Sequence, residues 1–191
     1  SKDSPMTWFS PDPRGILHIE DYHLSKSFKK FLNKTTYTIK VNRDFHEIIQ
    51  ACAITKRNHE VGTWINKEII TGFTALFNIG HAYCIGIYDA NELVGGLYGV
   101  TMGKYLTGES MFHKKANASK MALATVMYYL KANQIPFIDT QMVTPIIESL
   151  GGHEVPRKEF IKHLYALKSQ TLTRDEIFSN LIPAANQLSL L

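Results

Sequence analysis

The stretch AYCIGIYDANELVGGLYGVTMGKYLTGESMF, residues 82–112, decides the fold class of this chain. It contains three runs rich in β-branched and aromatic residues, the residue types most common in strands. The segments DANE and MGK, which separate the runs, are typical of short hairpin turns. Because such short turns join strands that pair with each other, the stretch predicts a three-stranded antiparallel meander.

Helical patterns flank the meander. Apolar residues recur at helical spacing in the segments 23–34, 44–54, 66–80, 118–134, 144–152 and 156–169. Two further strands are expected at 37–41 and 135–143, whereas residues 1–22, with three prolines, are expected to form an irregular arm. This order of elements predicts an α+β protein with a mixed, largely antiparallel sheet flanked by helices.

The composition is that of an ordinary globular protein, with 191 residues of which 45% are hydrophobic and 20% charged. No apolar run approaches the roughly 18 residues that span a bilayer, and residues 1–13 lack the apolar centre of a secretory signal. The two cysteines do not predict a disulfide framework, so we expect a cytoplasmic protein. No histidine or cysteine pair has zinc-site spacing, and we expect no metal. The net charge of +4 permits a nucleic-acid partner without requiring one.

The element order is compatible with the fold of acetyl-CoA-dependent N-acyltransferases, and we expect an acyltransferase-like core. In that fold, a glycine-rich turn before the central helix binds the pyrophosphate of coenzyme A through backbone N–H groups. The matching segment here is FHKKANAS, residues 112–119, which contains no glycine. The sequence therefore argues against acetyl-CoA as the cofactor.

Seven short motifs are distributed along most of the chain. In order, they are WFSPDPRGIL (8–17), GTWI (62–65), ELVGGLYGV (92–100), GESMF (108–112), NASK (117–120), IDTQ (138–141) and SLGGHEVPR (149–157). Each motif is weak alone, but in this order and spacing they resemble the leucyl/phenylalanyl-tRNA–protein transferase family. The resemblance extends from residue 8 to about residue 165.

This resemblance implies an aminoacyltransferase that moves leucine, phenylalanine or methionine from its tRNA to the N-terminal α-amine of an acceptor protein. The usual acceptors begin with Arg or Lys, and the product is marked for degradation by the N-end rule. The family has an acyltransferase-type core and uses neither coenzyme A nor a metal, so no cofactor is expected. The implied partners are an aminoacyl-tRNA and a protein N-terminus, and no membrane.

Asp139 and Gln141 stand two residues apart in a predicted strand and therefore point to the same side. A purely structural interpretation is that they end the strand and cap the segment after it. With the resemblance, we expect Gln141 to be catalytic, because its carbonyl oxygen can accept a hydrogen bond from the attacking amine. Asp139 would accept a hydrogen bond from the Gln141 amide and fix its orientation. The alternative is that Asp139 is a general base, directly or through water.

The resemblance also implies substrate-binding residues. Leu97 would form the floor of an apolar aminoacyl pocket, and the glycines around it would let the ligand approach the strand backbone. Glu109 is expected in the active site, although a glutamate at a strand end is usually a solvated charge. Trp8 and Trp64 would lie near the tRNA end, where a tryptophan can stack on an adenine, or would simply anchor loops.

Residues at the start of the long helix 118–134, together with two groups of lysines, extend this predicted site. Asn117 and Ser119 are expected either to cap that helix or to serve the substrate through nearby N–H groups. Lysines that could contact tRNA phosphates, or form ordinary solvated faces, are Lys26, Lys29, Lys30, Lys114 and Lys115. We expect residues 1–34 to be an N-terminal arm and basic helix, the remnant of the family's small N-terminal domain. Residues 35–191 would be the acyltransferase-like catalytic domain.

The sequence departs from the family pattern at several positions. Thr140 replaces a usual cysteine and Phe73 a usual tyrosine, while Thr144 and Ile146 stand where Asn and His are common. Carboxylates are needed to bind an N-terminal Arg or Lys. Candidates for this role are Glu109 and Glu154. Two alternatives stay open: an acetyl-CoA-dependent N-acetyltransferase and a non-catalytic tRNA-binding module.

Overall fold

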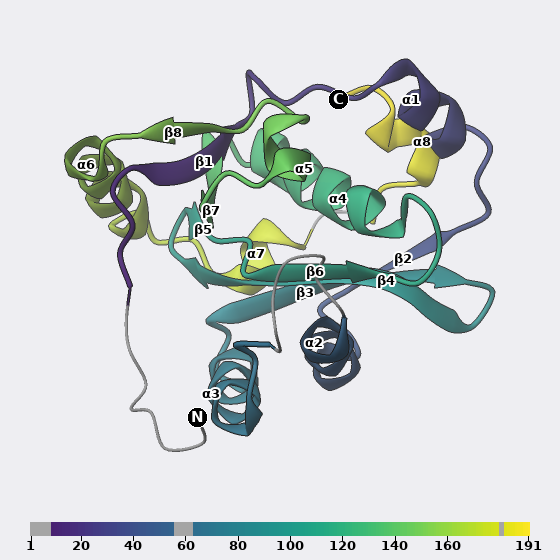
Figure 1. The fold of residues 1–191 in the computed structure, drawn as a ribbon, viewed down its shortest axis with the longest axis horizontal. Coiled ribbons are helices and arrows are strands. Elements are labelled where there is room, and N and C mark those ends of the chain that lie inside the picture. The colour runs from purple at the N-terminus through teal and green to yellow at the C-terminus, as the bar shows by residue number, and fades with distance from the viewer. Residues whose placement is uncertain (1–8, 56–62, 180–181) are drawn as a thin grey trace.

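The computed structural model describes residues 9–55, 63–179 and 182–191, and these form two sheets (Figure 1). The large sheet contains β2 (Thr38–Val41), β3 (Ala82–Asp89), β4 (Glu92–Met102), β5 (Tyr105–Leu106) and β6 (Ser110–His113). The small sheet contains β7 (Phe137–Gln141), β1 (Arg14–His18) and β8 (His153–Val155), in that order. All of these strands pair antiparallel.

The predicted meander is confirmed as the centre of the large sheet. β3 and β4 are joined by a two-residue turn at Ala90 and Asn91, where Ala90 has a φ of 52°. The middle of β4 pairs with β6, from Gly95 opposite His113 to Tyr98 opposite Ser110, while its end pairs with the short β5. The structure therefore has one more short strand in the meander than the sequence predicts.

Helices cover both faces of the large sheet (Figure 1). One face packs against α2 (Phe45–Ile54) and α3 (Lys67–Asn78), and the other packs against α4 (Ala118–Ala132). Eleven residues of α4 are buried, from Ala118 to Leu130, which is typical of a helix enclosed by the protein. The remaining helices are α1 (Lys26–Leu32), α5 (Pro145–Glu148), α6 (Arg157–Lys168), α7 (Arg174–Ile177) and α8 (Ala185–Leu188). The predicted α+β class is confirmed.

The prediction of an irregular arm over residues 1–22 is wrong for the part that forms β1. Residues 14–18 are the central strand of the small sheet, paired with β7 on one side and β8 on the other. The proline pattern could not reveal this, because the partners of β1 lie more than a hundred residues away. Residues 1–8 lie outside the described residues.

The domain boundary after residue 34 stays a prediction. Leu17, Phe28 and Leu32, which precede that boundary, lie in the same core cluster as the buried residues of α4.

The glycines of β4 do not leave space for a ligand, contrary to the expectation from the sequence. A Cβ added to Gly95 would lie 2.4 Å from the Cβ of Ala118, the first residue of α4. A Cβ added to Gly99 would lie 1.8 Å from the carbonyl oxygen of Thr107. These glycines let α4 and the β5–β6 connection approach the strand, so the space beside them is filled by the protein itself.

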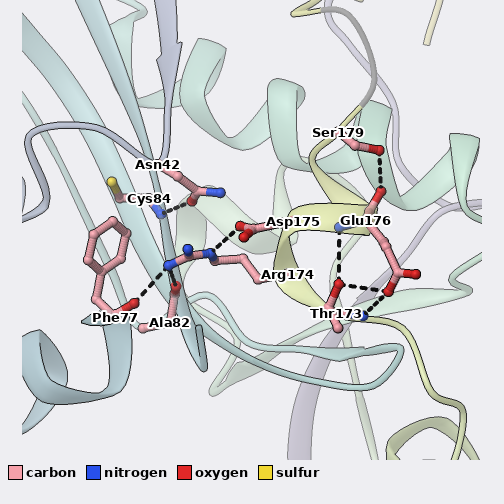
Figure 2. Close-up of polar contacts among 9 residues, drawn as sticks. All are labelled: Asn42, Phe77, Ala82, Cys84, Thr173, Arg174, Asp175, Glu176 and Ser179. Atoms are coloured by element: carbon pink, nitrogen blue, oxygen red, sulfur yellow. Dashed lines mark hydrogen bonds and ion pairs between the residues drawn. The ribbon is translucent and has the colours of Figure 1, made fainter. Parts of the chain in front are cut away.

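The C-terminal segment, which matches none of the sequence motifs, is fixed to the large sheet by Arg174 (Figure 2). Its Nη1 donates hydrogen bonds to the carbonyl oxygens of Phe77, at 2.8 Å, and Ala82, at 3.3 Å. The guanidinium group also lies 4.8 Å from the centre of the Phe77 ring. The Phe77 carbonyl, in the last turn of α3, also accepts from the backbone N–H of Gly80 at 3.1 Å, so Arg174 adds a further hydrogen bond at this helix end.

Candidate functional site

A cavity of about 370 Å³ lies where α5, β6 and the end of β7 meet. Its walls are mainly apolar, and the side chains that form them are Leu97, Met111, Leu123, Ile138, Ile146 and Ile147. Its polar lining comes from Glu109, Ser110, Thr140, Gln141 and Thr144, with Trp64 and Met142 also in the wall. An apolar cavity with a few convergent polar groups is the usual form of a small-molecule site.

Two larger cavities lie elsewhere. One of about 790 Å³ is formed by the end of α3, His81 and residues 170–176. Another of about 450 Å³ lies between residues 32–39 and the start of α8. Neither is lined by any residue that the sequence predicts for catalysis or aminoacyl binding, so the smaller, more apolar cavity is the candidate site.

One backbone contact brings two separate parts of the site together. The N–H of Gly108 donates to the carbonyl oxygen of Asp139 at 2.8 Å, in a parallel bridge that pairs Thr107 with Asp139. This bridge places the segment carrying Glu109 beside the end of β7, which carries Gln141. The β5–β6 connection and β7 therefore face the same cavity, although they are about 30 residues apart in the chain.

Asp139 lies fully buried behind the cavity, with an exposed fraction of 0%. Arg14 of β1 holds its carboxylate with two hydrogen bonds, from Nε to Oδ1 at 2.9 Å and from Nη2 to Oδ2 at 2.7 Å. The Tyr105 hydroxyl donates a further hydrogen bond to Oδ2, and the backbone N–H of Gln141 donates one to Oδ1 at 2.9 Å. A buried carboxylate is stable only when paired and hydrogen-bonded in this way.

The neighbours of Asp139 show the electrostatic effect of this arrangement. Burial lowers the pKa of Arg14, but the hydrogen bonds and charge of Asp139 outweigh it, and the net pKa is raised. Burial, then the charge of Asp139, raises the pKa of Tyr105 well above its ordinary value. Arg14 therefore stays charged and Tyr105 stays protonated as a hydrogen-bond donor at neutral pH.

Gln141 differs from the sequence expectation in how it contacts Asp139. Its side-chain amide nitrogen donates to the main-chain carbonyl of Asp139 at 3.3 Å, not to the carboxylate. Because a carbonyl only accepts hydrogen bonds, this contact fixes which end of the amide is the nitrogen. Gln141 also has a φ of 60°, in the left-handed region, and so leaves the extended conformation at the end of β7.

Glu109 lines the cavity and is half-buried. Its Oε1 accepts a hydrogen bond from the Thr107 hydroxyl at 2.8 Å, and the Thr107 hydroxyl itself accepts from the N–H of Val100 at 2.8 Å. Burial raises the pKa of Glu109, and the nearby Asp139 charge adds to this rise, although Thr107 and Arg14 oppose it. Glu109 is therefore a carboxyl group whose ionised form is disfavoured by its surroundings.

The other predicted substrate residues lie in different places. Leu97 forms part of the cavity wall and Trp64, with 43% of its surface exposed, forms part of its rim. Asn117 is the residue before α4, with a left-handed backbone and no side-chain capping hydrogen bond. Ser119 lies inside α4, and its Oγ is hydrogen-bonded to Nδ1 of His113 at 3.3 Å. Neither Asn117 nor Ser119 lines the cavity. Trp8 lies outside the described residues.

The lysines predicted to bind phosphates form two groups away from the cavity. All three lysines of the first group, Lys26, Lys29 and Lys30, lie on α1; Lys26 and Lys30 are exposed, whereas Lys29 is half-buried. Lys114 is exposed before α4, whereas Lys115 contacts Asp89 at 2.8 Å and Glu92 at 3.8 Å. The charge of Lys115 is therefore partly compensated within the chain.

Arg14 and Tyr105 are the residues of this site that the sequence does not identify. A signal for Arg14 was present, because an aspartate predicted in a buried strand requires a cationic partner. WFSPDPRGIL contains one cation, Arg14, but nothing local indicates that it lies beside residue 139.

The hydroxyl of Thr140 is buried and has no hydrogen-bond partner in the described part of the chain. This is consistent with the departure from the family pattern at this position, where a cysteine is usual.

Comparison with known proteins identifies the chain. A family model described as leucyl/phenylalanyl-tRNA protein transferase matches residues 16–165. The chain belongs to this family. The resemblance stated from the sequence motifs is therefore confirmed, and the chain is an aminoacyltransferase of the tRNA–protein transferase class.

Curated relatives support the same assignment. A leucyl/phenylalanyl-tRNA–protein transferase from Pseudoalteromonas atlantica is 46% identical over 164 residues, covering 86% of this chain and 70% of the relative. The protein of the same name from Tolumonas auensis is 41% identical over 167 residues, covering 87% and 71%. That from Shewanella baltica is 38% identical over 172 residues, covering 90% and 72%.

Solved structures with similar arrangements are distant in sequence. L-PGS from Bacillus licheniformis has a TM-score of 0.47 and 12% identity, covering 69% of this chain and 46% of that one. A ribosomal-protein-alanine N-acetyltransferase from Brucella melitensis has a TM-score of 0.40 and 14% identity, covering 60% and 88%. Because both TM-scores are low, the family assignment depends on the family model and the curated relatives.

Two further observations concern the described residues alone. No group of three or more His, Cys, Asp or Glu side chains within 9–55, 63–179 and 182–191 is arranged to hold a metal ion. None of the helices in this part of the chain is both long and apolar enough to span a bilayer.

Proposed function

We propose that the chain transfers leucine, phenylalanine or methionine from an aminoacyl-tRNA to the N-terminal α-amine of a protein, with the cavity at α5, β6 and β7 as its active site. The observation that carries this proposal is the position of Gln141, which lines an apolar cavity large enough for one such side chain. The apolar walls would hold the aminoacyl side chain, and Gln141 would lie where the ester carbonyl meets the incoming amine.

The reaction is the aminolysis of an ester. The α-amine nitrogen attacks the ester carbonyl carbon, a C–N bond forms, and the C–O bond to the terminal ribose breaks. The ribose oxygen leaves as a hydroxyl after taking up the proton that the amine loses. The ester is already activated, and an α-amine has a reference pKa of about 7.7–8.0, so a useful fraction is unprotonated near neutrality. Catalysis then depends mainly on holding the amine against the carbonyl.

Gln141 is suited to this positioning role. With its amide nitrogen donating to the Asp139 carbonyl, its Oε1 is left to accept a hydrogen bond from the amine. Asp139 is not suited to act as a general base, because it is fully buried and holds an ion pair with Arg14. These contacts favour the positioning mechanism over the alternative in which Asp139 removes the proton.

The apolar lining of the cavity supports the amino-acid preference. Leu97, Leu123 and Ile138 give it apolar walls that suit large apolar side chains not branched at Cβ. Discrimination by shape is limited to about 1–3 kcal/mol per methylene, so we expect leucine, phenylalanine and methionine all to be accepted. Isoleucine and valine, which branch at Cβ beside the reacting carbonyl, would be disfavoured.

The lysines of α1 would contact tRNA phosphates, with Lys114 as a second contact point and Lys115 a weaker one because of its partners Asp89 and Glu92. Such contacts make affinity fall as salt rises. Each phosphate contact makes the slope of log binding constant against log salt concentration more negative by about 0.7–0.9. Asn117, Ser119, Trp8 and Trp64 stay candidates for contacts with the tRNA end. Residues 1–34, which include the basic helix α1, would contribute further tRNA contacts.

The acceptor would be a protein that begins with Arg or Lys, and the product would enter N-end-rule degradation in the cytoplasm. Glu109 is the carboxyl group in the lining of the cavity that can face a cation, and Glu154 on β8, a strand of the small sheet, is a second candidate outside that lining. An ionised carboxylate is the natural partner for a basic N-terminal residue.

One assay tests the proposal. Labelled leucyl-tRNA is incubated with the protein and either a peptide beginning with Arg or a matched peptide beginning with Asp. Transfer to the Arg peptide alone is the expected result. Transfer only to the Asp peptide would overturn the acceptor assignment but keep the reaction, whereas tight tRNA binding without transfer would leave a binding module. Coenzyme A, which the glycine-free segment 112–119 is not built to hold, should show no binding in the same buffer.

A further inference from the structure

We infer that Arg14 and Gly15, neighbouring residues of β1, are positioning residues for Gln141. Arg14 acts through the carboxylate of Asp139, and Gly15 acts through the backbone after Gln141. This inference rests on the role proposed for Gln141 in the transfer reaction, and it assigns to β1 a function that neither the sequence motif nor the family name indicates.

Gln141 needs external support to keep its conformation. Its φ of 60° lies in the left-handed region, which a non-glycine residue adopts only when its surroundings hold it there. Two hydrogen bonds to Asp139 supply part of this support, one from the backbone N–H to Oδ1 and one from the side-chain amide to the carbonyl oxygen. The orientation of Gln141 therefore depends on where the Asp139 carboxylate lies.

Arg14 determines the position of that carboxylate. Its planar guanidinium binds both oxygens at once, at 2.9 and 2.7 Å, a geometry that a lysine cannot reproduce. The guanidinium is itself fixed, because its carbon lies 5.0 Å from the centre of the Phe160 ring of α6. Contacts thus run from α6 to Arg14, from Arg14 to Asp139, and from Asp139 to the backbone N–H of Gln141.

Gly15 restrains Gln141 from the opposite direction. It pairs with Gln141 across β1 and β7, at the point where the register of the two strands shifts. A Cβ added to Gly15 would lie 2.5 Å from the carbonyl carbon of Met142 and 2.8 Å from the nitrogen of Val143. The backbone after Gln141 therefore passes directly over Gly15, and any side chain at position 15 would displace it.

Both residues touch the support of Gln141 and neither lines the cavity. Disturbing them should move Gln141 out of line with the ester while leaving the apolar walls in place. The expected signature is a fall in kcat with little change in the KM for leucyl-tRNA, because binding of the aminoacyl group depends on other residues.

The test uses two variants that disturb Gln141 independently. Arg14→Lys keeps the positive charge but loses the two-point contact, and Gly15→Ala keeps the ion pair but pushes on residues 142 and 143. A displacement of about 1 Å can lower a rate on the order of 10²-fold, and we expect falls approaching this size in kcat for transfer to an Arg peptide. In a Gln141→Ala background, Arg14→Lys should lower kcat no further, because the group that it positions is gone.

Matched controls are available elsewhere in the chain. Arg174 is buried to a similar degree as Arg14: 16% of the Arg174 side chain is exposed and 11% of the Arg14 side chain. Like Arg14, it also lies over a phenylalanine ring, that of Phe77 (Figure 2). Its partners Phe77, Ala82 and Asp175 do not line the candidate cavity, so Arg174→Lys should lower the melting temperature without lowering kcat. Gly72, around which a new Cβ would meet nothing within 4 Å, gives the control Gly72→Ala, with kcat unchanged.

The outcomes separate this inference from the proposed function. A wild-type protein that transfers nothing would refute the proposed function whatever the variants do. With an active wild type, the inference is overturned if Arg14→Lys and Gly15→Ala raise KM at constant kcat, or lower kcat no more than the controls do. If either variant fails to fold, the other decides. If both fail, the charge-neutral double variant Arg14→Gln/Asp139→Asn replaces them and should also lose kcat.

Discussion

Replacing Gly95 by alanine tests whether the glycines of β4 are needed for packing or for a ligand. The new Cβ would lie 2.4 Å from the Cβ of Ala118 and 2.9 Å from its carbonyl carbon, so the N-terminal end of α4 would have to move away from the sheet. Overpacking of this kind costs about 1–3 kcal/mol in the free energy of unfolding. For a chain of this size, that corresponds to a fall of about 2–12 °C in melting temperature.

The assay is thermal and urea unfolding of the wild type, Gly95→Ala and the control Gly72→Ala. Gly72 lies inside α3 with open space around it, and a helical glycine is less stable than alanine by roughly 0.5–1 kcal/mol, so the control should be slightly stabilised. Adding Ala118→Gly to Gly95→Ala removes the closest contact and should recover part of the loss. The packing explanation fails if Gly95→Ala keeps wild-type stability while losing affinity for leucyl-tRNA, because that pattern indicates a ligand beside the strand.

Other consequences of the site can be measured in the same protein. Burial raises the pKa of Glu109, so its contribution to stability is present while the carboxyl is protonated and is lost as pH rises through the folded-state pKa. The melting temperature of Glu109→Gln should therefore exceed that of the wild type by a growing margin as pH rises from about 4 to 8, with no difference at the acid end. Asp139→Asn should cost about 3–5 kcal/mol in urea unfolding, since it leaves the buried Arg14 without its counter-ion; a loss within the range of exposed ion pairs, below about 1 kcal/mol, would contradict the arrangement. Leu97→Ala should reduce transfer of leucine more than that of phenylalanine in a competition assay, because the larger ring still fills the widened cavity; equal losses would remove Leu97 from the aminoacyl pocket. Changing Lys26, Lys29 and Lys30 together to glutamine should flatten the salt dependence of tRNA binding, and an unchanged slope would place the tRNA elsewhere.

Local patterns in the sequence were sufficient for most of the secondary structure. Strand and helix periods are properties of neighbouring residues, which is why the meander at 82–112 and the buried helix after it could be predicted without any tertiary information. The motifs also brought Leu97, Glu109 and Gln141 together as site candidates, and all three line one cavity. Their roles in the reaction stay predictions until the variants are assayed.

The sequence by itself determined the α+β class, the family and the presence of an aspartate beside a glutamine in a buried strand. Only the tertiary structure decided that Arg14 pairs with Asp139 across 125 residues, that β1 is a central strand, and that α4 occupies the space beside Gly95. The physical reason is the range of the interactions. A backbone period is written in adjacent residues, but ion pairs, strand partners and close packing depend on segments that only folding brings into contact.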